Sequence, residues 1–239
     1  MWDNPRLLNA WAGALTALAL MVFGVALAQL LARSPLFPVR EMQLTGAPAH
    51  TTRAQIESVV QGRVAGNFFA VDLDEVRAAL EALPWVRRAH VRRVWPDRLE
   101  VALEEHEALA RWAESGLVNV QGERFAGTTD AALPLFAGPA GSEGEVARRY
   151  QRFREILAPL QAMPERLMVS PRHAWVLRLD DGLTIALGRD AANDPVEARL
   201  RRLVAAYPQT LGRLARKAEH VDLRYPNGFA LRLPEHKGG

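Results

Sequence analysis

LPWVRRAHVRRVWPDRLEVALE, residues 83–104, alternates apolar and charged side chains on both sides of a Pro-Asp turn. Ala89 and Val91 fall on one face of the first half, and Leu99 and Val101 fall on one face of the second. A period of two is typical of half-buried strands. The segment therefore predicts two strands joined by a turn, and Trp85 is expected in the core where a helix meets the first strand.

Two short helices are predicted upstream of these strands. Thr52 with Gln55, and Asp72 with Glu75, have the spacing of N-terminal capping boxes. Apolar residues follow each box at helical spacing; they are Ile56, Val59 and Val60 in the first helix, and Leu73, Val76, Leu80 and Leu83 in the second. A strand is expected at 39–44. The order strand, helix, helix, strand, strand predicts a small α+β unit with both helices on one face of the sheet.

The N-terminus carries an uncharged run at residues 7–32, bounded by Arg6 and Arg33. About 20 apolar residues suffice to cross a bilayer as a helix, so the run predicts a transmembrane anchor. The alternative is a signal peptide cleaved after Ala28, although the apolar stretch exceeds the usual length of a signal sequence. We expect an uncleaved anchor with residues 1–6 in the cytoplasm and the remaining chain outside it. Gly24 and Ala28 share a helix face with Ala32, where another helix could approach closely.

A second, β-rich unit is predicted beyond residue 106. One helix has an apolar stripe of Val146, Tyr150, Phe153 and Leu157. The Asp-Gly pair at 181–182 separates two alternating runs, which is a strong hairpin signal. A second helix is expected from Pro195, followed by two alternating runs that end at residue 233. The overall fold class is therefore α+β, with antiparallel strands and flanking helices in this unit.

No enzymatic site is predicted. The 239 residues include no cysteine and carry a formal charge of only +3, which excludes thiol chemistry and gives no strong field for nucleic acid. Nucleophile-elbow, phosphate-loop and zinc-protease motifs are absent. Glu105, His106 and Glu107 form the best acid–base cluster, but alternation along a strand would separate His106 from its neighbours. We expect no catalytic, cofactor-binding or metal-binding residues.

Several of these segments resemble the FtsQ family of bacterial cell-division proteins. The matching motifs are Phe37-Pro38-Val39, Thr45-Gly46, Leu83-Pro84-Trp85-Val86, Val91-Arg92-Arg93, Trp95-Pro96-Asp97-Arg98-Leu99, Leu187-Gly188-Arg189, Tyr207-Pro208 and, most specifically, the run VDLRYPNGFA at 221–230. The resemblance implies a βααββ POTRA domain at 37–106 and a C-terminal β-rich FtsQ domain at 107–233. A short tail at 234–239 would follow.

The resemblance also implies a function. Proteins of this family are non-enzymatic, single-pass inner-membrane scaffolds of the divisome, with periplasmic domains that bind FtsB and FtsL and help to control septal peptidoglycan synthesis. The family binds FtsB around its final strands, where the matching residues are Arg224, Tyr225 and Phe229, with Arg172 a further candidate. A chain that ends soon after its last strand leaves that strand's edge free for β-augmentation. In the alternative interpretation, Phe229 is a core residue and Tyr225 a turn residue.

Two other function classes remain open at this point. One is a periplasmic binding protein or enzyme released by signal cleavage. The other is a POTRA-bearing component of an envelope assembly or transport system, which would need a barrel of alternating strands where arginine-rich helices are predicted instead.

Overall fold

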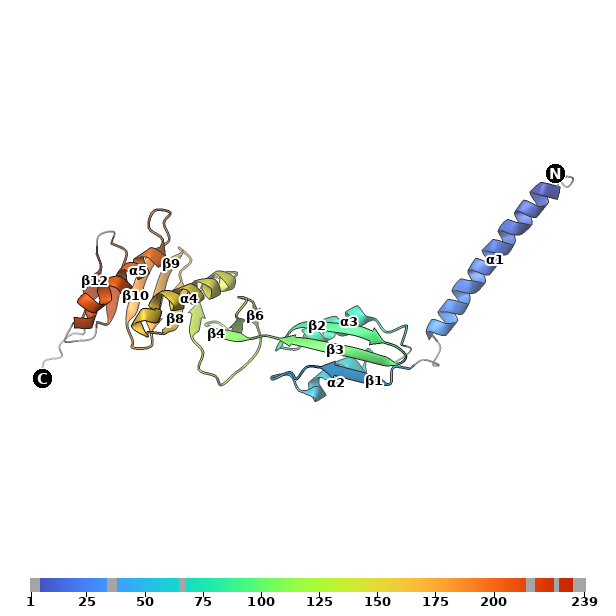
Figure 1. Cartoon of the computed structure of the whole chain (residues 1–239), viewed down its shortest axis with the longest axis horizontal. Helices are drawn as coiled ribbons and strands as arrows, with labels where there is room; N and C mark the ends of the chain where they lie inside the picture. The colour runs from blue at the N-terminus through green and yellow to red at the C-terminus, as the bar shows by residue number, and fades with distance from the viewer. Residues whose placement is uncertain (1–4, 34–37, 65–67, 214–217, 226–227, 234–239) are drawn as a thin grey trace. The chain divides into compact units, whose positions relative to one another are not determined.

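The computed structural model describes residues 5–33, 38–64, 68–213, 218–225 and 228–233. Figure 1 shows the N-terminal helix and the helices and strands that follow it. The chain falls into two compact units, Met1–Glu105 and His106–Gly239. The predicted tail at 234–239, most of the predicted head at 1–6, and the Pro226-Asn227 pair of the VDLRYPNGFA motif lie outside the described residues.

Helix α1, Pro5–Arg33, contains the predicted apolar run. Its most apolar part, Asn9–Leu30, has 22 residues and is wholly exposed. At 1.5 Å per residue this part is about 33 Å long, which matches the roughly 30 Å hydrocarbon core of a bilayer. Large apolar side chains such as Trp11, Met21 and Phe23 are exposed along it. By length and composition, α1 is therefore suited to cross a membrane.

The remainder of the first unit has the predicted βααββ order. Its elements are β1 (Glu41–Thr45), α2 (Arg53–Gln61), α3 (Leu73–Glu81), β2 (Val86–Val94) and β3 (Arg98–Glu105). The sheet order is β1-β3-β2, with β1 parallel and β2 antiparallel to the central β3. The predicted helix starts are confirmed, because Thr52 and Gln55 form a complete capping box and the Asp72 carboxylate accepts two backbone N–H groups.

The core of this unit lies between its helices and its sheet. Fully or nearly fully buried residues come from both, and they are Ile56, Val60, Val71, Val76, Leu80, Val86, Ala89, Leu99 and Val101. The expectation that Trp85 belongs to this core was wrong. Trp85 is half-buried, and its ring stacks on that of His50 with centroids 3.8 Å apart. The helix-to-strand turn thus places the indole against a loop and not among the core side chains.

The second unit is built on one large sheet. Its strands are β4 (Ala108–Trp112), β5 (Leu117–Asn119), β6 (Arg124–Phe125), β7 (Leu135–Ala137), β8 (Pro164–Val169), β9 (Ala174–Leu179), β10 (Thr184–Arg189), β11 (His220–Asp222) and β12 (Ala230–Arg232). Their order in the sheet is β12-β11-β10-β9-β8-β7-β4-β5-β6. The predicted hairpin at 181–182 is confirmed as the antiparallel pair β9–β10.

The sequence analysis predicted antiparallel strands in this unit, but three of the strand pairs are parallel. β10 pairs with β11, β7 with β8, and β4 with β7 in parallel. Each of these parallel pairs is joined by a long connection; the one between β10 and β11 contains helix α5, and the one between β7 and β8 contains helix α4. A parallel pair needs such a crossover, and alternation within a strand does not reveal it.

Helices α4 (Glu143–Leu157) and α5 (Val196–Ala206) cover one face of the sheet, as seen in Figure 1. Short 3-10 turns, η1 (Ala158–Leu160), η2 (Tyr207–Gln209) and η3 (Leu211–Arg213), follow the two helices. The predicted stripe of α4 is fully confirmed, since Val146, Tyr150, Phe153 and Leu157 are all buried. They pack in one core with strand residues that include Leu167, Trp175, Leu177, Ile185, Leu187 and Val221.

Candidate partner-binding site

Strand β12 forms one end of the large sheet. One of its edges pairs antiparallel with β11, and no strand of the described chain lies on its other edge. Apolar side chains are exposed around it: Tyr225 is 54% exposed, Leu231 38% and Leu233 44%. An unpaired strand edge with exposed apolar side chains is the surface that a peptide needs in order to extend a sheet.

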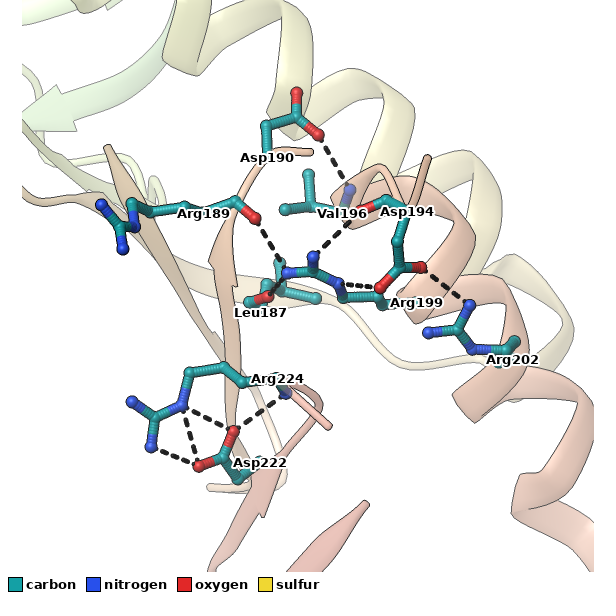
Figure 2. Close-up of polar contacts among 9 residues, drawn as sticks. All are labelled: Leu187, Arg189, Asp190, Asp194, Val196, Arg199, Arg202, Asp222 and Arg224. Atoms are coloured by element: carbon teal, nitrogen blue, oxygen red, sulfur yellow. Dashed lines mark hydrogen bonds and ion pairs between the residues drawn. The ribbon is translucent and has the colours of Figure 1, made fainter. Parts of the chain in front are cut away.

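Arg224, in the connection from β11 to β12, is held in a defined orientation. Its Nε is 2.9 Å from both carboxylate oxygens of Asp222, and its Nη2 is 2.5 Å from Oδ2. Figure 2 shows this pair with its contacts as dashed lines. The hydrogen bond from Arg224, opposed by partial burial, lowers the pKa of the Asp222 carboxyl. The same pairing raises the pKa of the Arg224 guanidinium. The Arg224 side chain is still 65% exposed, so its remaining N–H groups are available to a partner.

The Arg224 side chain packs across the backbone of Gly188 in β10. Gly188 has φ +76°, and a Cβ placed on it would lie 2.8 Å from Cγ of Arg224 and 3.2 Å from Nη1 of Arg199. A glycine is required here for two reasons: the left-handed backbone and the close approach of both arginines. Gly188 therefore helps to set where the Arg224 guanidinium lies.

Beneath this contact, Arg199 of α5 ties the end of β10 to the helix. The buried guanidinium donates from Nη1 to the carbonyl oxygens of Leu187 (2.6 Å) and Arg189 (2.9 Å). Its Nε donates to the Asp194 carboxylate at 2.7 Å, and its Nη2 to the Asp194 carbonyl at 3.0 Å. Hydrogen bonds from Arg202 and Arg199 lower the pKa of the Asp194 carboxyl. Figure 2 shows this network beside the Arg224–Asp222 pair.

A groove of about 300 Å³ lies between α5 and the β11–β12 connection. Its apolar lining includes Leu203, Ala206, Leu223 and Phe229. Phe229 is half-buried and packs against the core of the unit. The alternative interpretation of this residue as a core side chain therefore describes it in part, although one side of the ring lines the groove.

Arg172 lies in the turn between β8 and β9, and it is exposed. Because Gly188 pairs with Trp175 and Arg189 with Ala174, this turn is at the end of the sheet where Arg224 crosses Gly188. The candidates Arg224 and Tyr225 follow β11, and Phe229 immediately precedes β12. Arg172 lies at the same sheet end but is separated from Arg224 by strands β9 and β10.

Sequence reasoning missed the roles of Gly188 and Arg199. Arg199 lies on the apolar side of α5, one residue before Leu200. A charged side chain among apolar helix positions is the feature of the sequence that could have revealed its role. A buried arginine is rare unless it is paired, so a hydrogen-bonded partner could have been expected from this position. Gly188 interrupts a run of alternating strand residues. A glycine inside a strand often marks a place where another part of the molecule approaches the backbone closely.

The acid–base cluster at 105–107 is divided by the fold. Glu105 ends β3, where its carboxylate accepts backbone N–H groups of Ala49, His50 and Thr51 at 2.7–3.2 Å. In the second unit, His106 Nδ1 is 2.9 Å from Nδ2 of the buried Asn119. Both groups are engaged in local structure. Among the residues the structure describes, no group of three or more His, Asp or Glu side chains could hold a metal ion.

Within the described residues, these features define a class: a protein with one candidate membrane helix, a small βααββ unit, and a β-rich unit with a strand edge on which no other strand lies. Comparison with known families assigns the same two units. Residues 37–106 match the POTRA domain of FtsQ type, and residues 110–224 match the C-terminal domain of the cell division protein FtsQ/DivIB. The chain belongs to the FtsQ family of cell-division proteins.

Three curated relatives that match over nearly the whole chain are each named cell division protein FtsQ. The protein from Burkholderia pseudomallei is 46% identical, over 97% of this chain and 94% of its own. That from Nitrosospira multiformis is 40% identical, over 97% and 99%, and that from Bordetella pertussis 38%, over 99% and 96%. The family and the apolar helix α1 together support a single-pass inner-membrane protein of the divisome.

Proposed function

We propose that this protein is a non-enzymatic divisome scaffold that binds FtsB-type and FtsL-type partners outside the cytoplasm. Through this binding it would help to control septal peptidoglycan synthesis. The observation that carries the proposal is the edge of β12 on which no described strand lies, with exposed Tyr225 and the oriented Arg224 in the connection from β11 to β12. A partner segment would add to β12 as a further strand, with main-chain hydrogen bonds giving affinity and neighbouring side chains giving selectivity.

Each candidate residue has a distinct role in this proposal. The Tyr225 ring supplies apolar area and a hydroxyl, a combination that is enriched at binding hot spots. Arg224 keeps free donors for a partner carboxylate, because Asp222 occupies only part of its guanidinium. Phe229 lines the adjoining groove, and Arg172 would contact a partner segment that continues past the end of the sheet.

The test is a Tyr225→Ala substitution in the full-length chain, held in detergent micelles. We expect at least about a tenfold loss of affinity for the periplasmic segment of the FtsB-type partner, since truncating a hot-spot residue costs about 2 kcal/mol or more. Because Tyr225 is more than half exposed, melting should remain that of the parent. Met163→Ala, which truncates another exposed apolar side chain, is the matched control and should bind normally. Parental affinity of the Tyr225 variant would place the interface elsewhere.

The proposed topology has the N-terminus in the cytoplasm and both units in the periplasm, with recruitment to the septum. It is tested by N-terminal sequencing of the membrane-extracted protein and by a C-terminal reporter that is active only after export. An intact N-terminus and an active reporter are expected. A mature protein that begins at Gln29 would instead support the signal-cleaved alternative.

A further inference from the structure

The face of the large sheet that is opposite α4 and α5 carries a row of five residues, four of which have basic side chains. Arg166 pairs with Arg178, Arg178 with Thr184, Thr184 with His220, and His220 with Arg232, each on the next strand from β8 to β12. Residues that face each other in this way have Cβ atoms about 5 Å apart. We call these five residues the basic row.

The alternation of each strand places the basic row on the face away from the helices. The neighbours Leu167, Leu177, Ile185 and Val221 are fully buried in the core shared with α4 and α5. Successive side chains of a strand point to opposite faces, so the row points the other way. Its three arginines are exposed, in agreement with this placement.

The row has an unfavourable arrangement of charge. Arg166 and Arg178 are directly opposite each other, and like charges in that position destabilise a sheet. Glu165 approaches Arg178, with Oε2 3.5 Å from Nε, but both side chains are at least half exposed and the pair is weak. In the described part of the chain, Arg166 and Arg232 have no ion pair at all. A charge repulsion that destabilises the sheet, and that no nearby acidic side chain offsets, is typical of a functional surface.

Beside the basic row runs a parallel row that is small or apolar except for Asp222, whose carboxylate binds Arg224. Met168 pairs with Val176, and Val176 with Ala186; across β11, Asp222 pairs with Ala230. Met168, Val176 and Ala186 are half-buried, so they offer apolar contact area next to the charges. A partner with one acidic stripe and one apolar stripe would complement both rows.

We propose that this open face binds an acidic, amphipathic stretch of the same partner segment that adds to β12. The inference rests on the proposed function, because Arg232 belongs both to the basic row and to β12. A strand added to β12 would have every second side chain on the open face, directly continuing the row from Arg232. An acidic residue at that position, and further acidic residues in the chain that crosses the face, would neutralise Arg166 and Arg178.

The experiment reverses two charges, Arg166→Glu with Arg178→Glu, in the full-length chain in detergent micelles. The probe is the FtsB-type periplasmic segment, titrated at low and at high ionic strength. We expect about tenfold weaker binding at low ionic strength and a much smaller difference at high ionic strength, because exposed charge pairs are screened by salt. The control, Arg148→Glu with Arg201→Glu, changes the net charge equally on the helices of the opposite face and should bind as the parent does.

The outcomes separate this inference from the proposed function. If Tyr225→Ala abolishes binding while the double variant keeps parental affinity, the open face is not used and the edge proposal stands. An equal loss in the control variant would show a general charge effect and would also overturn the inference. A difference that appears only when phosphatidylglycerol is added to the micelles would assign the row to anionic lipid and not to the partner. If the parent and all variants fail to bind, the proposed function is wrong, and the inference that rests on it is overturned with it.

Discussion

Substituting Gly188 by alanine tests the packing that orients Arg224. A non-glycine residue in the left-handed region costs about 1–2 kcal/mol. The added Cβ would also approach Cγ of Arg224 and Nη1 of Arg199. Arg224 is exposed and can move, but Nη1 is fixed by two carbonyl oxygens, and a hydrogen bond to a charged group is worth about 1.5–3 kcal/mol. We therefore expect Gly188→Ala to destabilise the second unit by roughly 3–5 kcal/mol.

Gly182→Ala provides the matched control. Gly182 has φ +93°, and a Cβ there would have no heavy atom within 4 Å, so this variant pays only for the backbone conformation. In calorimetry, each 1 kcal/mol corresponds to about 4 °C for a unit of this size. Gly188→Ala should thus melt roughly 8 °C below Gly182→Ala, and only Gly188→Ala should weaken partner binding. Equal melting temperatures would refute the argument that the two arginines require this glycine.

Four further substitutions test the two units. Leu80→Ala should cost about 2–5 kcal/mol because the side chain is fully buried, and Trp85→Ala should cost clearly less; the reverse order in denaturant titrations would restore Trp85 to the core. Thr52→Ala should cost about 1 kcal/mol of unfolding free energy by removing the cap of α2. The lowered pKa of Asp222 contributes stability that is present above the unfolded carboxyl pKa of about 3.9 and is lost as the pH falls through the folded value. Arg224→Leu should therefore make acid unfolding, followed by circular dichroism, less steep below about pH 4.

Features encoded within a few residues were predictable from the sequence. The capping box of α2, the apolar stripe of α4 and the 181–182 hairpin each depend on side chains that are three to seven positions apart or on one turn. Local hydrogen bonding and helical periodicity determine such features almost independently of the rest of the chain. The family resemblance then indicated which strands adjoin the candidate site.

Features that depend on distant segments were not predictable in this way. The parallel pairing of β10 with β11 brings together residues more than 30 positions apart, and nothing in either strand encodes its direction. The Arg199 network requires the end of β10 and the first turn of α5 to meet. Trp85 was assigned to the core by its apolar neighbours, yet its contact is with His50, in a loop far upstream. In each case, tertiary contacts override the local pattern.

The short length of β12 bears on how a partner would be selected. With only three residues, Ala230–Arg232, the strand offers few main-chain hydrogen bonds, which protects against indiscriminate pairing of exposed edges. In the proposed complex, further affinity would therefore come from side chains. Tyr225, Leu231 and the groove beside Phe229 would supply one set of contacts, and the basic row that ends at Arg232 would supply another on the open face. Because a one-residue slip moves every side chain of an added strand to the opposite face, a shifted partner would place its acidic residues against Leu231 instead. In the proposed complex, the charge pattern of the open face would thus specify the register of the added strand, a task that three residues of backbone pairing cannot perform alone.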